Sequence, residues 1–300
     1  MSGFLADFSN ELANAVERAG ASVISVPEGG REGVSGTIWR DGVAITAEHT
    51  IRGLDEVDVV LPSGAEVKAA VAGRDYGTDI AVLKVQDAGP GAKLADEAQT
   101  RVGEIVLSIG RRREEGLAAT YGLISAIGGP WRTHQGARID RWLRLDLNPF
   151  PGFSGGPVVN ARGEVLGMAT SGPRRSAATI PASTVNRVVD QLLQKGRVAR
   201  AYLGVGIQPV AFPEGTARTL GIAGDRGLLV VMVEPRGPAA IAGILLGDII
   251  VRVDGAELHG LHGLQGSLDP DKIGQAAAVE VVRGGKLVPV NVVVGERPEK

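Results

Sequence analysis

The sequence predicts a mainly β protein in which two small barrels are followed by a smaller β-rich domain. Three observations support this prediction. Short apolar runs punctuated by Gly, Pro and Asp recur over the first part of the chain, one amphipathic helix follows them, and a second series of short β segments fills the remainder. Regularly spaced short strands with turn residues between them are typical of sandwiches and barrels.

An N-terminal segment, residues 1–20, has apolar residues at helical spacing, which favours a short helix docked on the protein by one face. The strands that follow are expected at 21–26, 35–39, 43–47, 57–61, 66–73, 80–85, 104–109, 117–127, 142–145, 157–160 and 165–170. Asp41-Gly42, between two of these runs, signals a tight hairpin turn. These strands suffice for two small barrels, and a site at their junction would draw residues from both.

The hydrophobic period changes at Thr184–Lys195, where five apolar residues fall on one helical face and Gly196 follows as a stop signal. This helix is expected to close a first domain at residues 21–196. A short linker, 197–201, then leads to a second domain at 202–300. Its strands are expected at 203–208, 227–233, 249–253, 278–282 and 287–293, with a helix at 238–245.

Composition excludes several classes of function. The 300 residues carry a formal charge of −2 with both signs interspersed, so nucleic acid is not an expected partner. The absence of cysteine excludes disulfides, thiol catalysis and thiolate metal sites, and no metal or organic cofactor is expected. No signal peptide or membrane-spanning run is recognised. As written the chain would be cytoplasmic, or periplasmic or in the cell envelope if its N-terminus was trimmed, so the compartment is left open.

His49, Asp79 and Ser154 are the candidate catalytic residues. His49 follows a predicted strand, Asp79 precedes another, and Ser154 lies between glycines in Gly152-Phe153-Ser154-Gly155-Gly156. A serine hydroxyl is a weak nucleophile that needs a base, an imidazole can be that base near neutral pH, and a carboxylate orients the imidazole. The chain order His, Asp, Ser is one known order of this triad. Backbone N–H groups of Gly152 and Ser154 would form the oxyanion hole.

The sequence also offers alternatives to these assignments. Asp75 competes with Asp79 for the role of the carboxylate, but Asp79 directly abuts an apolar strand. The same glycines also match the nucleophile elbow of α/β-hydrolases, which requires a histidine after the serine and a helix directly behind it. Gly155-Gly156-Pro157 is a poor helix start. The other histidines, His134, His259 and His262, are expected to have solvated or groove-lining roles.

Taken together, these motifs resemble the HtrA (Deg) family of serine proteases, in which a trypsin-like double barrel precedes PDZ domains. Residues 45–49 resemble the histidine motif of the family, 78–85 its aspartate motif and 154–160 its nucleophile motif. Phe153 departs from the family pattern, which usually has Asn before the serine. The segment Asn148–Gly152 is also bulkier than the usual Asn-Pro-Gly.

The second domain resembles a PDZ domain of this family. Tyr202-Leu203-Gly204-Val205 resembles its carboxylate-binding loop, where backbone N–H groups bind a peptide C-terminus and the next strand pairs with the peptide. Leu264 and Leu268 would line the groove opposite this loop, with ordinary core packing as the alternative.

The resemblance implies a serine endopeptidase that degrades unfolded or damaged proteins in protein quality control, with C-termini bound by the PDZ domain. It also implies a homo-oligomer, by resemblance a trimer, for which Phe4 and Phe8 are candidate contacts. The main alternative is a weakly active or inactive chaperone or peptide-binding scaffold in which the Phe153 loop blocks the oxyanion hole. A second alternative is a PDZ adaptor without enzymatic activity.

Overall fold

A computed structural model describes residues 3–28, 31–112, 116–133, 136–147, 151–171, 177–213, 215–222, 224–258 and 260–298. The protein is mainly β, as the sequence predicts, and divides into two compact units, Met1–Val198 and Ala199–Lys300. None of the helices in the described ranges has the length and apolar character needed to cross a bilayer.

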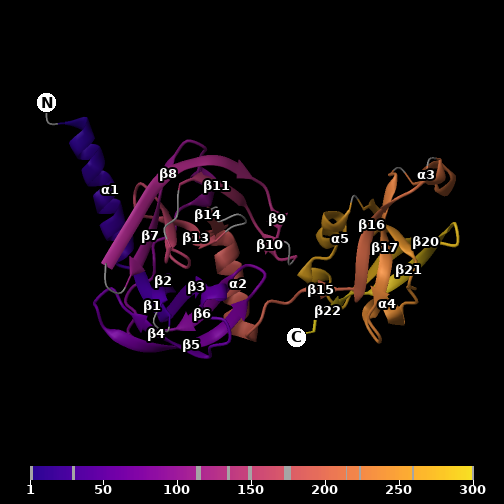
Figure 1. Ribbon diagram of the computed structural model, residues 1–300, viewed down its shortest axis with the longest axis horizontal. Helices are drawn as coiled ribbons and strands as arrows, with labels where there is room; N and C mark the ends of the chain where they lie inside the picture. The colour runs from indigo at the N-terminus through magenta and orange to yellow at the C-terminus, as the bar shows by residue number, and fades with distance from the viewer. Residues whose placement is uncertain are drawn as a thin grey trace. The chain divides into compact units, whose positions relative to one another are not determined.

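The first unit begins with a closed antiparallel barrel (Figure 1). Its strands are β1 (Val23–Glu28), β2 (Arg31–Arg40), β3 (Val43–Ala47), β4 (Glu56–Val60), β5 (Glu66–Asp75) and β6 (Ile80–Lys84), in the spatial order β1-β2-β3-β6-β5-β4. The Asp41-Gly42 hairpin joins β2 to β3, and Gly42 has the positive φ of 68° that this turn requires. Ile24, Ile38 and Leu83 fill the interior with no exposed surface.

A second six-stranded sheet has the order β11-β8-β7-β12-β13-β14. Its strands are β7 (Ile105–Arg112), β8 (Gly116–Gly128), β11 (Trp142–Asp146), β12 (Pro157–Asn160), β13 (Val165–Ser171) and β14 (Ala177–Pro181). The edge strands β11 and β14 lie against each other, which gives this sheet its barrel-like form. A small separate sheet pairs β9 (Trp131–Arg132) with β10 (Arg138–Ile139). The sequence pattern did not predict β9, β10 or β14.

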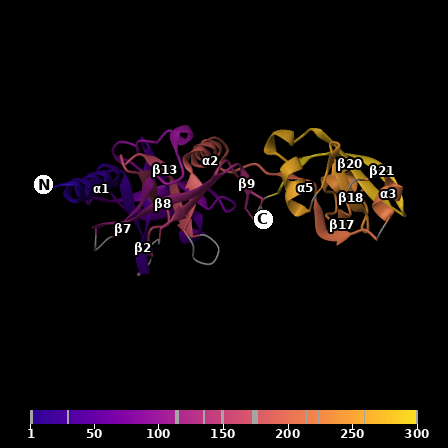
Figure 2. The same ribbon diagram turned by 90° about the horizontal axis from the view of Figure 1, so that it is seen from above.

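Two helices complete the first unit. The helix α2 (Ala182–Lys195) packs on β5 and β6 of the first barrel and on β13 and β14 of the second, and it ends at Gly196 with φ 72°, as predicted. The N-terminal helix α1 (Phe4–Gly20) packs on β7 and β12 through its C-terminal half, where Ala15 and Ala19 are buried. Its start projects away from the barrels (Figures 1 and 2).

The second unit is a sheet in the order β16-β17-β18-β20-β21. These strands are β16 (Val205–Ala211), β17 (Arg226–Val233), β18 (Ile249–Val253), β20 (Ala276–Arg283) and β21 (Lys286–Val293). Short strands β15 (Ala201–Tyr202) and β22 (Gly295–Glu296) pair with each other, and β19 (Ala256–Glu257) pairs with β18. The short helices are α3 (Thr216–Leu220), α4 (Pro238–Ile241) and α5 (Leu261–Ser267).

The helix expected at 238–245 is shorter than predicted. It ends at Ile241 because Gly243 takes a left-handed φ of 84°, which turns the chain out of the helix. Asp248 then accepts a hydrogen bond from the Leu245 N–H at 2.8 Å, which holds the loop that follows.

Candidate active site

His49 and Asp79 meet because they flank neighbouring strands of the first barrel. His49 lies in the short 3₁₀ helix η1 (Glu48–Thr50) directly after β3. Asp79 directly precedes β6, where Ile80 pairs with Ala47. The imidazole Nδ1 lies 2.8 Å from Asp79 Oδ2 and 3.0 Å from Oδ1. The backbone N–H of His49 also donates to Oδ1 at 2.9 Å. One carboxylate therefore fixes both the ring and the main chain of His49.

The backbone at Asp79 is itself unusual. Its φ is 60°, a left-handed value that non-glycine residues seldom adopt and that Asp tolerates better than most. Its carbonyl accepts the N–H of Glu48 at 3.1 Å, so that this conformation is held from the histidine turn. Backbone strain of this kind clusters at functional sites.

A third residue contacts the carboxylate from the second barrel. Thr170, on β13, donates its hydroxyl hydrogen bond to Asp79 Oδ2. In the sequence, Thr170 is only the last residue of the predicted strand 165–170, and no pattern there points to a contact with Asp79. The competing carboxylate, Asp75, accepts hydrogen bonds from the N–H and hydroxyl of Thr78 at 3.0 and 2.7 Å, so it holds a turn.

These contacts shift both pKa values. The hydrogen bond to Asp79 is the largest influence on His49 and raises its pKa above 6.5, against the opposing effect of burial. Burial is the largest influence on Asp79 and raises its pKa, but the hydrogen bonds from His49 and Thr170 outweigh it and leave the pKa lowered. The pair is therefore arranged to hold an anionic carboxylate beside an imidazole of enhanced basicity.

Ser154 lies in the turn of residues 151–156 that leads into β12 (the serine turn). Hydrogen bonds tie this turn to β2 and to β13, the strand that carries Thr170. The Ser154 carbonyl accepts the N–H of Ser35 on β2 at 3.1 Å, and the Gly155 N–H donates to Ala169, next to Thr170, at 2.8 Å. Gly155 has a φ of 87°, and a Cβ there would lie 2.1 Å from the Ser35 carbonyl oxygen and 2.6 Å from Thr46 Oγ1. Glycine at 155 thus lets the serine turn press against β3, the strand that leads to His49.

The predicted oxyanion-hole residues occupy a well-tethered turn. Gly152 has a φ of 89°, which favours glycine. The Phe153 carbonyl accepts the N–H of Gly156 at 2.9 Å. Because a trans peptide directs its N–H opposite to its carbonyl, the Ser154 N–H points away from Gly156. This orientation suits a donor for a developing oxyanion.

Phe153 is the residue on which the alternative of an inactive scaffold with a blocked oxyanion hole depends. Its side chain is only 1% exposed and ranks among the largest fully buried side chains. The ring packs against Gly110 on β7, where a Cβ would lie 2.5 Å from Phe153 Cδ1. The ring is therefore part of the protein interior, packed against β7. The segment 148–150 lies outside the described residues.

The predicted peptide-binding residues lie at one edge of the second unit. Gly204 has a φ of 80°, and Val205 begins β16, an edge strand of its sheet. Leu203 and Leu264 are 2% and 4% exposed and Leu268 packs against the same core cluster, so these leucines contribute to packing. Tyr202 pairs with Gly295. His134 and His259 lie outside the described residues, and of His262 only the backbone, in α5, is described.

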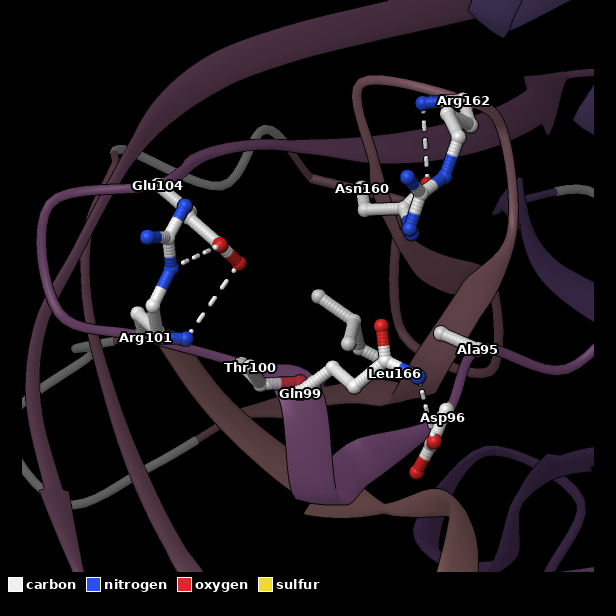
Figure 3. Close-up of a pocket in the computed structure, with 9 residues that line it drawn as sticks. All are labelled: Ala95, Asp96, Gln99, Thr100, Arg101, Glu104, Asn160, Arg162 and Leu166. Carbon is white, nitrogen blue, oxygen red and sulfur yellow. Dashed lines mark hydrogen bonds and ion pairs between the residues drawn. The ribbon is translucent and has the colours of Figure 1, made fainter.

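A cavity of about 210 Å³ lies on the second barrel and contains none of the candidate catalytic residues (Figure 3). Two arginines line it, but Arg101 pairs with Glu104 at 2.9 Å and Arg162 pairs with Glu164 at 3.1 Å. Their charges are thus already compensated. Within the described ranges, no three His, Cys, Asp or Glu side chains gather as metal ligands.

Comparison with known proteins gives the family. Residues 34–168 match the trypsin-like peptidase domain, and residues 201–294 match the PDZ domain. The solved structure of the HtrA-type protease AlgW with a tripeptide is 30% identical, covers 96% of this chain and 98% of its own, and superposes with a TM-score of 0.76. The chain belongs to the HtrA family. The solved structure of the serine endoprotease from Yersinia pestis is also similar, 28% identical with a TM-score of 0.76 over 96% of this chain and 98% of that one.

Curated relatives of this HtrA-family chain carry the name probable periplasmic serine endoprotease DegP-like. The protein from Brucella suis biovar 1 is 35% identical over 278 residues, which are 89% of this chain and 53% of the relative. The protein from Halomonas elongata is 35% identical over 269 residues, 87% of this chain and 56% of the relative. The chain spans about half the length of these curated relatives.

Proposed function

We propose that this HtrA-family chain is a serine endopeptidase with Ser154 as nucleophile, His49 as general base and then acid, and Asp79 as the orienting carboxylate. The arrangement of Asp79 carries this proposal. One carboxylate contacts the His49 ring at 2.8 Å and accepts the hydroxyl of Thr170, whose neighbour Ala169 binds the serine turn. Both barrels thus converge on a single acid–base pair.

The mechanism follows from the hydrogen bond that occupies one ring nitrogen of His49. Asp79 holds Nδ1 of His49, so Nε2 is the ring nitrogen that takes the proton from the Ser154 hydroxyl. The serine oxygen attacks the substrate carbonyl, and the N–H groups of Gly152 and Ser154 stabilise the resulting oxyanion. The imidazolium then protonates the leaving amine, and an acyl-enzyme remains. Water activated by the same imidazole hydrolyses this ester and regenerates the serine hydroxyl.

The substrates we propose are unfolded or damaged polypeptides. In the second unit, the edge of β16 is available for pairing with an extended peptide, and the loop 202–205 begins it. Relatives were solved with a decapeptide and a tripeptide bound, which supports peptide binding here. Titrating a fluorescent peptide with a free C-terminus, beside its C-terminal amide, tests this part. Equal affinity for the two would contradict carboxylate recognition by this loop.

Cleavage of β-casein by wild type and by Ser154→Ala tests the activity. We expect wild type to give discrete fragments, whose ends mass spectrometry identifies, and Ser154→Ala to give none. The cut sites also report the preferred side chain. A wild type that leaves β-casein intact in the presence of C-terminal peptides, or a Ser154→Ala variant that cleaves equally well, would contradict the proposal.

We also propose that the chain assembles into a homotrimer and works in the periplasm. Phe4 and Leu5, at the start of α1, are 83% and 78% exposed, and the rings of Phe4 and Phe8 stack with centroids 6.3 Å apart. Exposed apolar side chains gathered at one helix end suit an interface between subunits. Light scattering of wild type beside Phe4→Ser tests the assembly, and a monomeric wild type contradicts it. The periplasmic location rests on the names of the relatives, and cell fractionation tests it.

A further inference from the structure

One buried residue bonds the carbonyls of both residues proposed for the oxyanion hole. Ser35 lies on β2 and has no exposed surface. Its hydroxyl donates to the Gly152 carbonyl at 2.7 Å, and its backbone N–H donates to the Ser154 carbonyl at 3.1 Å. Gly152 and Ser154 are the two residues whose N–H groups would bind the oxyanion. Ser35 thus touches each of them from the side of the first barrel.

The orientation of the Ser35 hydroxyl is set by its other neighbour. The backbone N–H of Arg111, on β7, donates to Ser35 Oγ at 3.0 Å. An amide N–H can only donate, so the hydroxyl oxygen is the acceptor in that bond. Its own proton is therefore free to be directed at the Gly152 carbonyl. Two neighbouring elements, β7 and the serine turn, thus determine both hydrogen bonds of this side chain.

Three consecutive carbonyls of the serine turn are held in this way. Those of Gly152, Phe153 and Ser154 accept hydrogen bonds from Ser35 Oγ, Gly156 N and Ser35 N respectively. Each bond fixes a peptide plane and, with it, the N–H of the next residue. The Phe153 carbonyl thus fixes the donor N–H of Ser154, and the two bonds from Ser35 fix the planes on either side of it. Among these three bonds, only the one from Ser35 Oγ uses a side chain, so a substitution can remove it alone.

We infer that Ser35 is a positioning residue for the oxyanion hole. By holding the Gly152 carbonyl toward β2, its hydroxyl keeps the turn from rotating at Gly152, the residue with φ 89°. Donors stabilise an oxyanion strongly only when they are already aimed before the reaction. Without the hydroxyl, the Gly152 carbonyl has lost its partner, and rotation about the backbone bonds of Gly152 turns the Gly152 N–H out of the hole. This inference rests on the proposed peptidase function.

The chain offers a matched control for the test. Ser25, on β1, is the register partner of Ser35, and it too has no exposed surface. Its hydroxyl makes no hydrogen bond to any part of the chain that the structure describes. Ser35→Ala and Ser25→Ala therefore delete the same atom from equally buried, facing positions. Only the first deletion touches the serine turn.

Both variants are assayed with a fluorogenic peptide built from a mapped β-casein cut site and with the aldehyde of the same peptide as inhibitor. The aldehyde adds to the serine and places an oxyanion in the hole, so its affinity reports transition-state binding. We expect Ser35→Ala to lower kcat about 10- to 100-fold, somewhat less than loss of a direct donor, with KM changed by less than about threefold. Affinity for the aldehyde falls by a similar factor, and Ser25→Ala behaves like wild type.

The possible outcomes separate the two proposals. A Ser35→Ala variant with kcat and aldehyde affinity within about twofold of Ser25→Ala overturns the role of Ser35 while leaving the peptidase intact. A loss confined to KM overturns it as well. If Ser35→Ala fails to fold by circular dichroism, Ser35→Cys keeps the volume with a weaker donor, and an unchanged kcat there is equally contradictory. A wild type that cleaves nothing contradicts the proposed function, and the role of Ser35 falls with it.

Discussion

The contact between Gly110 and Phe153 allows a quantitative test of how the serine turn is supported. In Gly110→Ala, the new methyl carbon would lie 2.5 Å from Phe153 Cδ1 and 2.9 Å from both Phe153 Cε1 and Ser35 Oγ. Carbon atoms in contact prefer separations of about 3.5–4.0 Å, so the ring or the strand must move by about 1 Å. The ring is 1% exposed and has no open side into which to move.

Two opposing effects decide the stability of Gly110→Ala. Alanine restricts the unfolded chain, which would stabilise the protein by about 0.4–1 kcal/mol at a compatible site. Overpacking a filled core costs about 1–3 kcal/mol. We therefore expect the free energy of unfolding to fall by about 0–2.6 kcal/mol. The displaced turn carries Ser154, and a misplacement of about 1 Å is enough to lower kcat about 100-fold.

The assay measures the urea unfolding midpoint and kcat on β-casein-derived peptide for Gly110→Ala, Phe153→Ala and the double variant. Gly129→Ala is the matched control, since a Cβ there meets nothing within 4 Å. In the double variant, the methyl group added at position 110 enters space that the ring has left. We therefore expect the double variant to lose less free energy of unfolding than the two single variants together, by about 0.5–3 kcal/mol. Strict additivity, or a Gly110→Ala enzyme indistinguishable from Gly129→Ala, would refute this reasoning.

Three further predictions concern the acid–base pair. Asp79 raises the pKa of His49 above 6.5, and only the neutral imidazole accepts a proton. The value of kcat/KM should therefore rise with pH through a midpoint above 6.5. A midpoint below 6.5 contradicts the assignment of His49 as the base. Asp79→Asn should lower kcat on the order of 10⁴-fold and move the midpoint of any residual activity downward, whereas Asp75→Asn should lower thermal stability without moving that midpoint. Thr170→Val keeps the side-chain shape but removes a donor to the carboxylate, so kcat/KM should fall about tenfold; full activity would show that this contact is dispensable.

Most strands were predictable from the sequence because their burial alternates or runs continuously between turn residues. The strand β3 coincides with the predicted range 43–47, and β12 with 157–160. The strand β14, Ala-Ala-Thr-Ile-Pro, was not predicted because it has no hydrophobic pattern of its own. It forms a strand by pairing with β13. The two-residue strands β9 and β10 are too short to carry any period.

The candidate site could be predicted only where chemistry shows in local sequence. His49, Asp79 and Ser154 each stand beside a motif, so their types and order were readable. The residues that hold these three in position could not be predicted. Ser35 and Thr170 are ordinary hydroxyl residues within strands, and their partners lie 117 and 91 residues away in the chain. The space that Gly110 leaves for Phe153 likewise exists only once β7 and the serine turn are packed together.

The most direct test of the account is covalent labelling by a fluorophosphonate, followed by peptide mapping with mass spectrometry. This reagent reacts with a serine oxygen only when a base activates it and donors receive the developing charge. We predict a single adduct on Ser154, formed by wild type and lost in His49→Ala, which retains the serine. An adduct on another residue, equal labelling of His49→Ala, or no adduct in the presence of an unfolded substrate would contradict the central claim.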